Sequence, residues 1–249
     1  MLNRGKYHRD KYQGVRQIFA YNQTFYLGTL AALSGVLAIV FWLPPLLKTI
    51  AIFFLVGTTF WTLSSLAVSH WIYDRSPLYS LDWLAILPCT WLNVHAGLDE
   101  MTALFRMKFP AASYRVFDIF DATEMTEPSI ARVRALSGDT GQRASWKQLP
   151  ASGDAFEAIF LPFVAHEFRR TQARNIFFRE LARVLAPEGK IILVEHLRDL
   201  PNFLAFGPGF LHFQSRRAWA AAFRVANLRV TQEFSITPFV RVFEIERNG

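Results

Sequence analysis

Hydrophobic residues follow two different patterns along this chain. Between residues 17 and 73 they run almost without interruption, and Lys48 is the only Lys, Arg, Asp or Glu in that segment. After residue 90, short apolar runs alternate with longer stretches in which apolar positions recur every three or four residues. The first pattern is typical of membrane helices, and the second is typical of alternating strands and helices.

The uninterrupted region predicts two helices. Segments 26–43 and 50–71 each have about the 20 apolar residues that a bilayer-spanning helix needs, and Pro44 and Pro45 break the chain between them. We therefore expect a transmembrane helical hairpin over residues 26–73. A re-entrant hairpin is an alternative, because Lys48 and two prolines make a poor loop on the far side of a membrane. A pair of buried core helices is another.

Charge adds an orientation to this hairpin. The net charge is +7, and five basic residues lie in the first sixteen positions, where Asp10 is the only acid. Basic flanks stay on the cytoplasmic side, so we expect a basic N-terminal segment (1–25) and a cytoplasm-facing domain at the inner membrane. The partners expected are the lipid bilayer and an apolar or lipid-like substrate. No DNA-binding motif accompanies the charge, so we expect no nucleic-acid partner. Residues 74–89 are expected to form a linker along the membrane surface.

The second pattern predicts a domain over residues 90–249. Strands are expected over 91–94, 114–117, 144–147, 158–163 and 190–195, with helices over 99–109, 121–136 and 170–185. A helix over 216–226 and strands over 228–234 and 240–245 are expected to close the chain. This alternation predicts an α/β fold: a Rossmann-like, mostly parallel sheet with helices on both faces and a late antiparallel hairpin.

Several motifs of this domain resemble class I S-adenosylmethionine-dependent methyltransferases of the type 11-like group. They are the run 91–118, the segment 156–160, the pair His166-Glu167 and the run 179–190, which contains Arg-Val-Leu-Ala-Pro-Glu-Gly-Lys. The resemblance covers about residues 85–249. It implies S-adenosyl-L-methionine as cofactor, bound at the carboxyl ends of the first strands.

The resemblance also implies which residues would hold this cofactor. The family has an acid on strand one and then Gly-x-Gly-x-Gly, whereas Asn93, His95, Gly97 and Asp99 occupy these positions here, so only the middle glycine is kept. Glycine lets the backbone approach a ligand closely, because no Cβ stands in the way. The departure leaves open whether this divergent loop still binds the cofactor.

Further cofactor contacts are implied at the ends of the next two strands. Asp118 matches the family acid that accepts hydrogen bonds from the two ribose hydroxyls, a task that suits the two oxygens of a carboxylate. Phe117, beside it, is expected to touch the adenine ring. The family acid that reads the adenine amino group is missing after strand three, where Ser145 is the candidate substitute.

Polar side chains also follow the fourth and fifth predicted strands. His166-Glu167 and Glu195-His196 are expected to meet His95 at one edge of three adjacent strands. We predict that His166, Glu167 and His196 are catalytic, with a histidine deprotonating the acceptor. A divalent metal site and a purely structural role are the alternatives; no metal ligand is assigned.

The segment 198–213 is inserted after strand five and carries four phenylalanines. It is expected either to line an apolar substrate cavity or to pack as a helix in the core. The residues predicted to bind substrate are Glu195, Arg198, Asn202, Phe203, Phe206 and His212. Arg169, Arg170 and Arg174 are expected to form a solvated face.

Together these features predict a membrane-anchored methyltransferase that acts on an apolar or lipid-like acceptor. Two other classes stay open. One is a membrane scaffold with a degenerate methyltransferase fold and no catalysis, favoured by the missing glycines. The other is an enzyme that uses the same cofactor, or a metal, for a reaction other than methylation.

Overall fold

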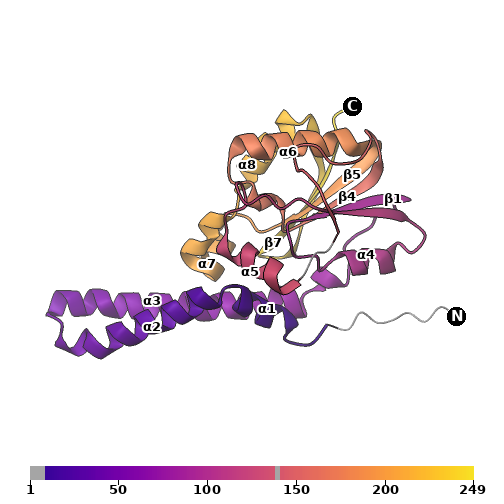
Figure 1. Ribbon diagram of the computed structural model, residues 1–249. Coiled ribbons are helices and arrows are strands. Elements are labelled where there is room, and N and C mark those ends of the chain that lie inside the picture. Colours follow the sequence, from indigo (N-terminus) through magenta and orange to yellow (C-terminus); the bar gives the residue numbers. More distant parts are fainter. Residues whose placement is uncertain (1–8, 138–140) are drawn as a thin grey trace.

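A helical hairpin projects from an α/β domain in the computed structural model, which describes residues 9–137 and 141–249 (Figure 1). The hairpin consists of α2 (Gln23–Ile39), which continues as the 3-10 turn Val40–Trp42, and α3 (Pro45–His70). Pro44 precedes the first turn of α3, and Pro45 begins it, where its missing N–H costs nothing. The expected break between the two helices is confirmed.

Both hairpin helices present apolar side chains to the outside. Phe41, Trp42, Leu46 and Phe53 are each more than 70% exposed. Residues Gln23–Trp42 and Pro45–Tyr79 are long and apolar enough to cross a membrane, and only 6% of each most apolar window is buried in the protein. A soluble core helix of this composition would be mostly buried, so this exposure argues against the core-helix alternative.

A short amphipathic helix precedes the hairpin and was not expected from the sequence. This helix, α1 (Gln13–Tyr21), begins at the carboxylate of Asp74, which accepts the backbone N–H groups of Gly14 at 2.6 Å and Val15 at 3.0 Å. A carboxylate at this position satisfies two of the free N–H groups of a helix start and complements its dipole. Asp74 lies in the π-helical turn Trp71–Arg75 that ends α3, so it joins α1 to the base of the hairpin.

The described residues form a seven-stranded sheet in the order β3-β2-β1-β4-β5-β7-β6, in which β7 alone is antiparallel to both neighbours. The strands are β1 (Thr90–His95), β2 (Ser113–Asp118), β3 (Gln142–Arg143), β4 (Phe156–Pro162), β5 (Leu185–Glu195), β6 (Leu228–Thr237) and β7 (Val240–Arg247). The predicted fold class and the late antiparallel hairpin are confirmed. The carboxyl ends of β1, β2, β4 and β5 therefore share one edge.

Each face of the sheet carries its own apolar core. Helices α6 (Thr171–Val184) and α8 (Arg216–Val225) cover one face (Figure 1). On the other face, α4 (Thr102–Lys108) packs with Ile72, Leu78, Leu81 and Leu84, each at most 2% exposed. The segment expected to lie on the membrane surface is therefore part of this core, because it fills space that α4 alone leaves uncovered.

Some predicted boundaries are wrong. The helix expected over 121–136 is α5 (Pro128–Ser137), because the Asp121 carboxylate holds residues 121–123 in a turn and Pro128 starts the helix. The third strand is only Gln142–Arg143, since Ser145 and Gln148 bridge each other across a turn. Strand β5 begins at Leu185, and its register against β4 shifts before Lys190, so the Pro-Glu-Gly turn is a bulge within the strand.

Candidate functional site

The turn after β1 is built on Gly97. Its φ is +126°, a backbone conformation that side-chain-bearing residues rarely adopt, and its N–H donates to Nδ1 of His95 at 3.1 Å. The His95 side chain is almost fully buried. His95 therefore supports the turn from within, which accounts for an imidazole where the resembled family has glycine.

Two other residues predicted to bind the cofactor brace the same turn. The side-chain amide of Asn93 donates to Asp99 Oδ1 at 3.1 Å and to Thr102 Oγ1 at 2.8 Å. Asp99 Oδ1 also accepts the backbone N–H of Thr102 at 3.0 Å, where α4 begins. Asn93 and Asp99, which the sequence predicted to contact the cofactor, are thus hydrogen-bonded to each other and to Thr102.

Asp118, at the end of β2, forms an ion pair that the sequence did not suggest. Nη1 of Arg134, from α5, lies 2.7 and 2.9 Å from the two carboxylate oxygens. The guanidinium also lies 4.3 Å from the centre of the Phe120 ring, and a Cβ built on Gly97 would meet Arg134 Cγ at 2.4 Å. Arg134 therefore extends from the glycine turn to Asp118, across the place where the predicted cofactor contacts lie.

A small pocket of about 320 Å³ opens beside this ion pair. It is lined by Asp118, Phe120, Arg134, Arg143, Ala144 and Ser145. Ser145, predicted to substitute for the missing acid, lines this pocket. Phe117 does not, because its side chain is fully buried in the core under α6 and α8; Phe120 supplies the aromatic ring that faces the pocket.

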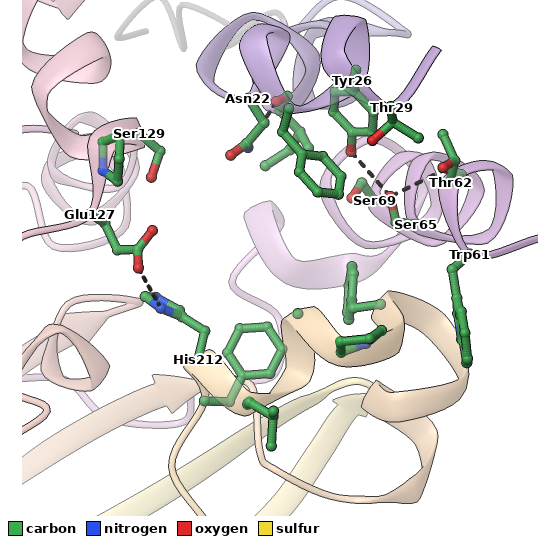
Figure 2. Close-up of a pocket in the computed structure, with 18 of the residues that line it drawn as sticks. Asn22, Tyr26, Thr29, Trp61, Thr62, Ser65, Ser69, Glu127, Ser129 and His212 are labelled. Carbon is green, nitrogen blue, oxygen red and sulfur yellow. Dashed lines mark hydrogen bonds and ion pairs between the residues drawn. The ribbon is translucent and has the colours of Figure 1, made fainter. Parts of the chain in front are cut away.

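A much larger cavity, of about 1290 Å³, lies between the ends of β4 and β5 and the helical hairpin (Figure 2). The sheet side contributes Phe163, His166, Glu167 and His196, and segment 206–213 contributes Phe206, Leu211 and His212, among others. The hairpin contributes Tyr26, Thr29, Thr58, Trp61, Thr62, Ser65 and Ser69, among others. Segment 198–213 is helical, as α7 (Leu200–Phe206) and the 3-10 turn Gly207–His212, and part of it lines this cavity. It does not pack as a core helix, because Leu200, Leu204 and Leu211 are more than half exposed.

His166 lies between two carboxylates in this cavity. Its Nδ1 is 2.7 Å from Glu195 Oε2, and its Nε2 is 3.2 Å from Glu167 Oε1. Burial alone would lower the pKa of His166, but the two carboxylates outweigh it and raise this pKa well above the usual value. An imidazole that is already protonated is a poor general base, so the geometry favours a positioning role for His166 over the predicted proton abstraction.

His212 joins this group from the 3-10 turn after α7. Its Nδ1 lies 3.3 Å from Glu127 Oε1, and its Nε2 lies 3.8 Å from Glu167 Oε1. Arg169 contacts both Glu127 and His212 from the more exposed side. His212, predicted to bind substrate, therefore stands beside His166 in the place where the sequence led us to expect His95.

His196 lies in an aromatic part of the cavity wall and is nearly fully buried. Its Nδ1–H donates to the carbonyl of Phe239 at 2.8 Å, and its Nε2 is 3.0 Å from the hydroxyl of Tyr73. Burial lowers the pKa of His196 to about 4, so this imidazole is neutral at physiological pH. Of the two histidines predicted to be catalytic, His196 has the protonation state that a base requires.

Four residues predicted to bind substrate lie outside the cavity wall. Glu195 is fully buried behind His166. Arg198 donates to the carbonyls of Phe213 and Leu211, and Asn202 donates to Asp199 at the start of α7, so both fold the inserted segment. Phe203 packs on Trp61 of α3. Arg174, expected on a solvated face, is buried and donates to the carbonyl of Phe168 at 3.0 Å.

Sequence reasoning missed Arg134, Glu127 and Tyr73. The helix in this stretch was predicted to begin at the wrong residue. Periodicity therefore could not indicate which way the side chains of Arg134 and Glu127 point. Tyr73 lies near the end of an apolar segment, a position typical of aromatic residues at a membrane interface, so its sequence context does not indicate a place in the cavity wall. The hydroxyl positions of α3 were visible as a stripe, because Thr58, Thr62, Ser65 and Ser69 recur every three or four residues.

Comparison with known proteins supports the nature of the domain. Residues 105–193 match the sequence model of a methyltransferase domain. No curated protein matches the chain.

Solved structures share the fold at low identity. An S-adenosylmethionine-dependent methyltransferase from Aquifex aeolicus has a TM-score of 0.51 and 16% identity, covering 70% of this chain and 94% of its own. The mitomycin 7-O-methyltransferase MmcR has a TM-score of 0.53 and 14% identity, covering 96% of this chain and 74% of its own. NcsB1, an O-methyltransferase from neocarzinostatin biosynthesis solved with S-adenosylmethionine and 2-hydroxy-5-methyl naphthoic acid, has a TM-score of 0.50 and 16% identity, covering 78% and 58%. The chain therefore has the fold of class I methyltransferases.

Proposed function

We propose that this protein is a membrane-anchored S-adenosylmethionine-dependent methyltransferase whose acceptor is an amphiphile from the lipid phase. One observation carries the proposal: a single cavity is lined both by the carboxyl ends of β4 and β5 and by the exposed apolar hairpin. In open α/β sheets, ligands bind at these carboxyl ends. An acceptor could therefore reach the methyltransferase domain without leaving the hairpin.

The residues of the cofactor side fit S-adenosylmethionine on one condition. Gly97 supplies the turn that a close ligand needs, Asp118 supplies two acceptor oxygens, and Ser145 and Phe120 line the adjoining pocket. The condition is that Arg134 leaves the carboxylate of Asp118, because its side chain crosses the same space. The bound cofactor would supply an activated methyl group, and this chain would supply alignment.

The hairpin side of the cavity suggests the chemistry of the acceptor. Tyr26, Thr62, Ser65 and Ser69 face the cavity from two helices that are mostly apolar, and the Tyr26 hydroxyl lies 3.1 Å from Ser65 Oγ (Figure 2). Polar side chains within membrane segments tend to face cavities and mark substrate paths. We infer an acceptor with a polar head that follows these hydroxyls and an apolar tail that stays in the lipid.

Calorimetric titration of the full chain in detergent tests the cofactor assignment. We expect S-adenosylhomocysteine to bind with a dissociation constant below about 1 mM, the upper end of common substrate constants. Asp118→Ala should abolish binding, whereas Asp82→Ala, at an exposed carboxylate, should not. No binding by the unmodified chain at millimolar ligand would refute the cofactor assignment.

Labelled methyl groups test the acceptor class. Membranes from cells that lack the gene are incubated with the protein and S-adenosylmethionine labelled in the methyl group. We expect label in the organic extract with the unmodified chain and none with Asp118→Ala. Label confined to the aqueous phase would contradict a lipid-phase acceptor.

A second candidate, a membrane protein with this fold and no catalysis, is favoured by the ion pair between Arg134 and Asp118. In that case Arg134 would occupy the cofactor site permanently. The two candidates differ in one measurement: a scaffold binds no S-adenosylhomocysteine even when Arg134 is replaced by alanine, whereas an enzyme binds it.

A further inference from the structure

Three potential metal ligands meet in the cavity from separate segments of the chain. One ligand atom from each of His166, Glu167 and His212 lies within 4.8 Å of the others. The two histidines come from different turns, one after β4 and one after α7, and their rings contact edge to face with centroids 4.9 Å apart. Two imidazoles and one carboxylate are a ligand set that catalytic zinc sites use, with the fourth position left for water or substrate.

Both histidines are oriented by a further carboxylate. Glu195, fully buried, accepts from the His166 ring at Nδ1 at 2.7 Å and from the His166 backbone N–H at 3.1 Å. Glu127 lies 3.3 Å from Nδ1 of His212, with Arg169 in contact with both. In both histidines, Nδ1 contacts a carboxylate that does not belong to the three-residue group, and Nε2 faces Glu167. Histidines that bind metals are commonly held in this way by a carboxylate on their other nitrogen.

Glu167 provides independent evidence for a missing partner. The residue is 8% exposed, and its Oε2 has no hydrogen-bond partner in the described part of the chain. Buried carboxylate oxygens are rarely left unpaired, because removing them from water without a partner costs free energy. The other oxygen, Oε1, already points at both imidazoles. A cation between the three groups would give the whole carboxylate a partner.

We propose that His166, Glu167 and His212 bind a divalent zinc-type metal ion, with Glu195 and Glu127 as the orienting carboxylates. His166, Glu167 and His212 all line the cavity, so a fourth ligand could reach the ion from there. Arg169, whose side chain is 45% exposed, contacts the group from the outside and can pair with Glu127 alone.

The role of this ion rests on the proposed function. A bound divalent metal lowers the pKa of a coordinated oxygen, as it does for water. At this position it would polarise a hydroxyl on the acceptor: the O–H bond breaks, the proton leaves to water, and the oxygen keeps the electron pair. The acceptor atom would then be oxygen, and the neutral imidazole of His196 would not be required for its activation.

Metal content of the full chain in detergent tests the site without any turnover. The protein is stripped with a chelator, incubated with Zn²⁺, desalted and analysed by mass spectrometry of the elements. We expect about one zinc per chain, and a visible absorption band when Co²⁺ replaces zinc. Glu167→Gln and His212→Asn should weaken Zn²⁺ binding at least tenfold, and Glu195→Gln by about 10–100-fold.

A matched control and a folding check separate this result from damage. His70→Gln removes another histidine that lies beside a carboxylate, Asp74 at 2.8 Å, with no third ligand, and should retain the zinc. Circular dichroism of each metal-free variant reports its fold. A stripped and reloaded wild-type chain that holds no more zinc than Glu167→Gln would overturn the site.

The outcomes also distinguish this site from the proposed function. Zinc retention without binding of S-adenosylhomocysteine would keep the metal site and overturn the methyltransferase assignment. Binding of S-adenosylhomocysteine without zinc retention would overturn the metal site alone.

Discussion

The proposed cofactor side and the proposed acceptor side of this protein occupy the same edge of one sheet and are built in opposite ways. At the ends of β1 and β2, polar groups pair with one another and Arg134 crosses the space in front of Asp118, leaving a pocket of about 320 Å³. At the ends of β4 and β5, the hairpin and segment 206–213 stand away from the sheet and enclose about 1290 Å³. The cofactor side is closed by the Arg134 side chain, and the acceptor side is held open by the hairpin and segment 206–213.

This difference shows that access to the two sides is controlled by different elements. The acceptor side opens toward the hairpin. The cofactor side depends on α5, which carries Arg134 and which also contacts α1, because Arg132 Nε donates to the carbonyl of Tyr21 at 2.5 Å. The helix that carries Arg134 is thus hydrogen-bonded to the helix at the base of the hairpin. Four predictions test this division.

The largest expected effect is on the acceptor side and depends on pH. The pKa of His196 is about 4 in the folded chain, against about 6.5 for an unperturbed imidazole, so the folded state keeps this side chain neutral. Below about pH 6.5 the unfolded chain takes up a proton that the folded chain refuses, and stability falls by up to about 3 kcal/mol as the pH approaches 4. Thermal unfolding at several pH values should show a shallower acid decline in His196→Asn. Equal declines in both proteins would show that His196 does not contribute to the pH dependence of stability.

The next effect concerns the backbone of the cofactor turn. Gly97→Ala should destabilise the protein by about 2 kcal/mol, because alanine strains a positive φ and its Cβ would meet Arg134. Gly28→Ala on α2, where a Cβ meets no atom within 4 Å, is the matched control and should cost nothing. If both variants melt at the wild-type temperature, the turn does not have the geometry described.

Arg134→Ala tests whether the cofactor side is closed by this side chain. Removing the guanidinium frees Asp118 and should tighten binding of S-adenosylhomocysteine about tenfold, or about 1.4 kcal/mol. Arg106→Ala, at an exposed position of α4, should leave the affinity unchanged. A weaker affinity in Arg134→Ala would mean that Arg134 helps to hold the ligand and does not compete with it.

The smallest effect separates the two sides. Ser65→Phe places a ring in the hairpin wall of the large cavity and should lower kcat/KM for the membrane acceptor about fivefold, or about 1 kcal/mol. Binding of S-adenosylhomocysteine should not change. Leu63→Phe, at a 61% exposed position on the same helix, is the control and should behave as the wild type. A parallel loss of cofactor affinity in Ser65→Phe would contradict two separate sides.

Much of the fold was predictable because its signals are local. The apolar length of the hairpin, the break at Pro44, the buried runs of β1 and β4 and the helix over Thr171–Val184 were all read from neighbouring residues. The predicted boundaries failed where a side chain from elsewhere sets the backbone. Residues 121–124 form a turn on Asp121, and Asp121 is held in turn by the Trp146 indole at 2.9 Å. A short pattern of apolar positions does not encode such a contact.

The position of the candidate site was predictable from the sequence, but the set of residues that form it was less so. His166, Glu167 and His196 were placed at the right edge because carboxyl ends of parallel strands share an edge. His95 was expected to join them and does not line the same cavity, since its ring turns back to the Gly97 amide. His212 takes its place because α7 folds against Trp61 of the hairpin, at a position where Gly207 leaves room for the indole.

The sequence by itself determined that this chain has an apolar hairpin, an α/β domain with methyltransferase motifs, and a glycine turn and strand-end aspartate in the expected order. These follow from periodicity, length and the conformational freedom of single residues, which act over a few positions. Only the tertiary structure decided that Arg134 lies across the cofactor side, that Glu127 and His212 join His166 and Glu167, and that the hairpin walls the acceptor cavity. These contacts depend on how whole helices pack on the sheet. Packing is determined by many contacts between residues that are far apart in the sequence.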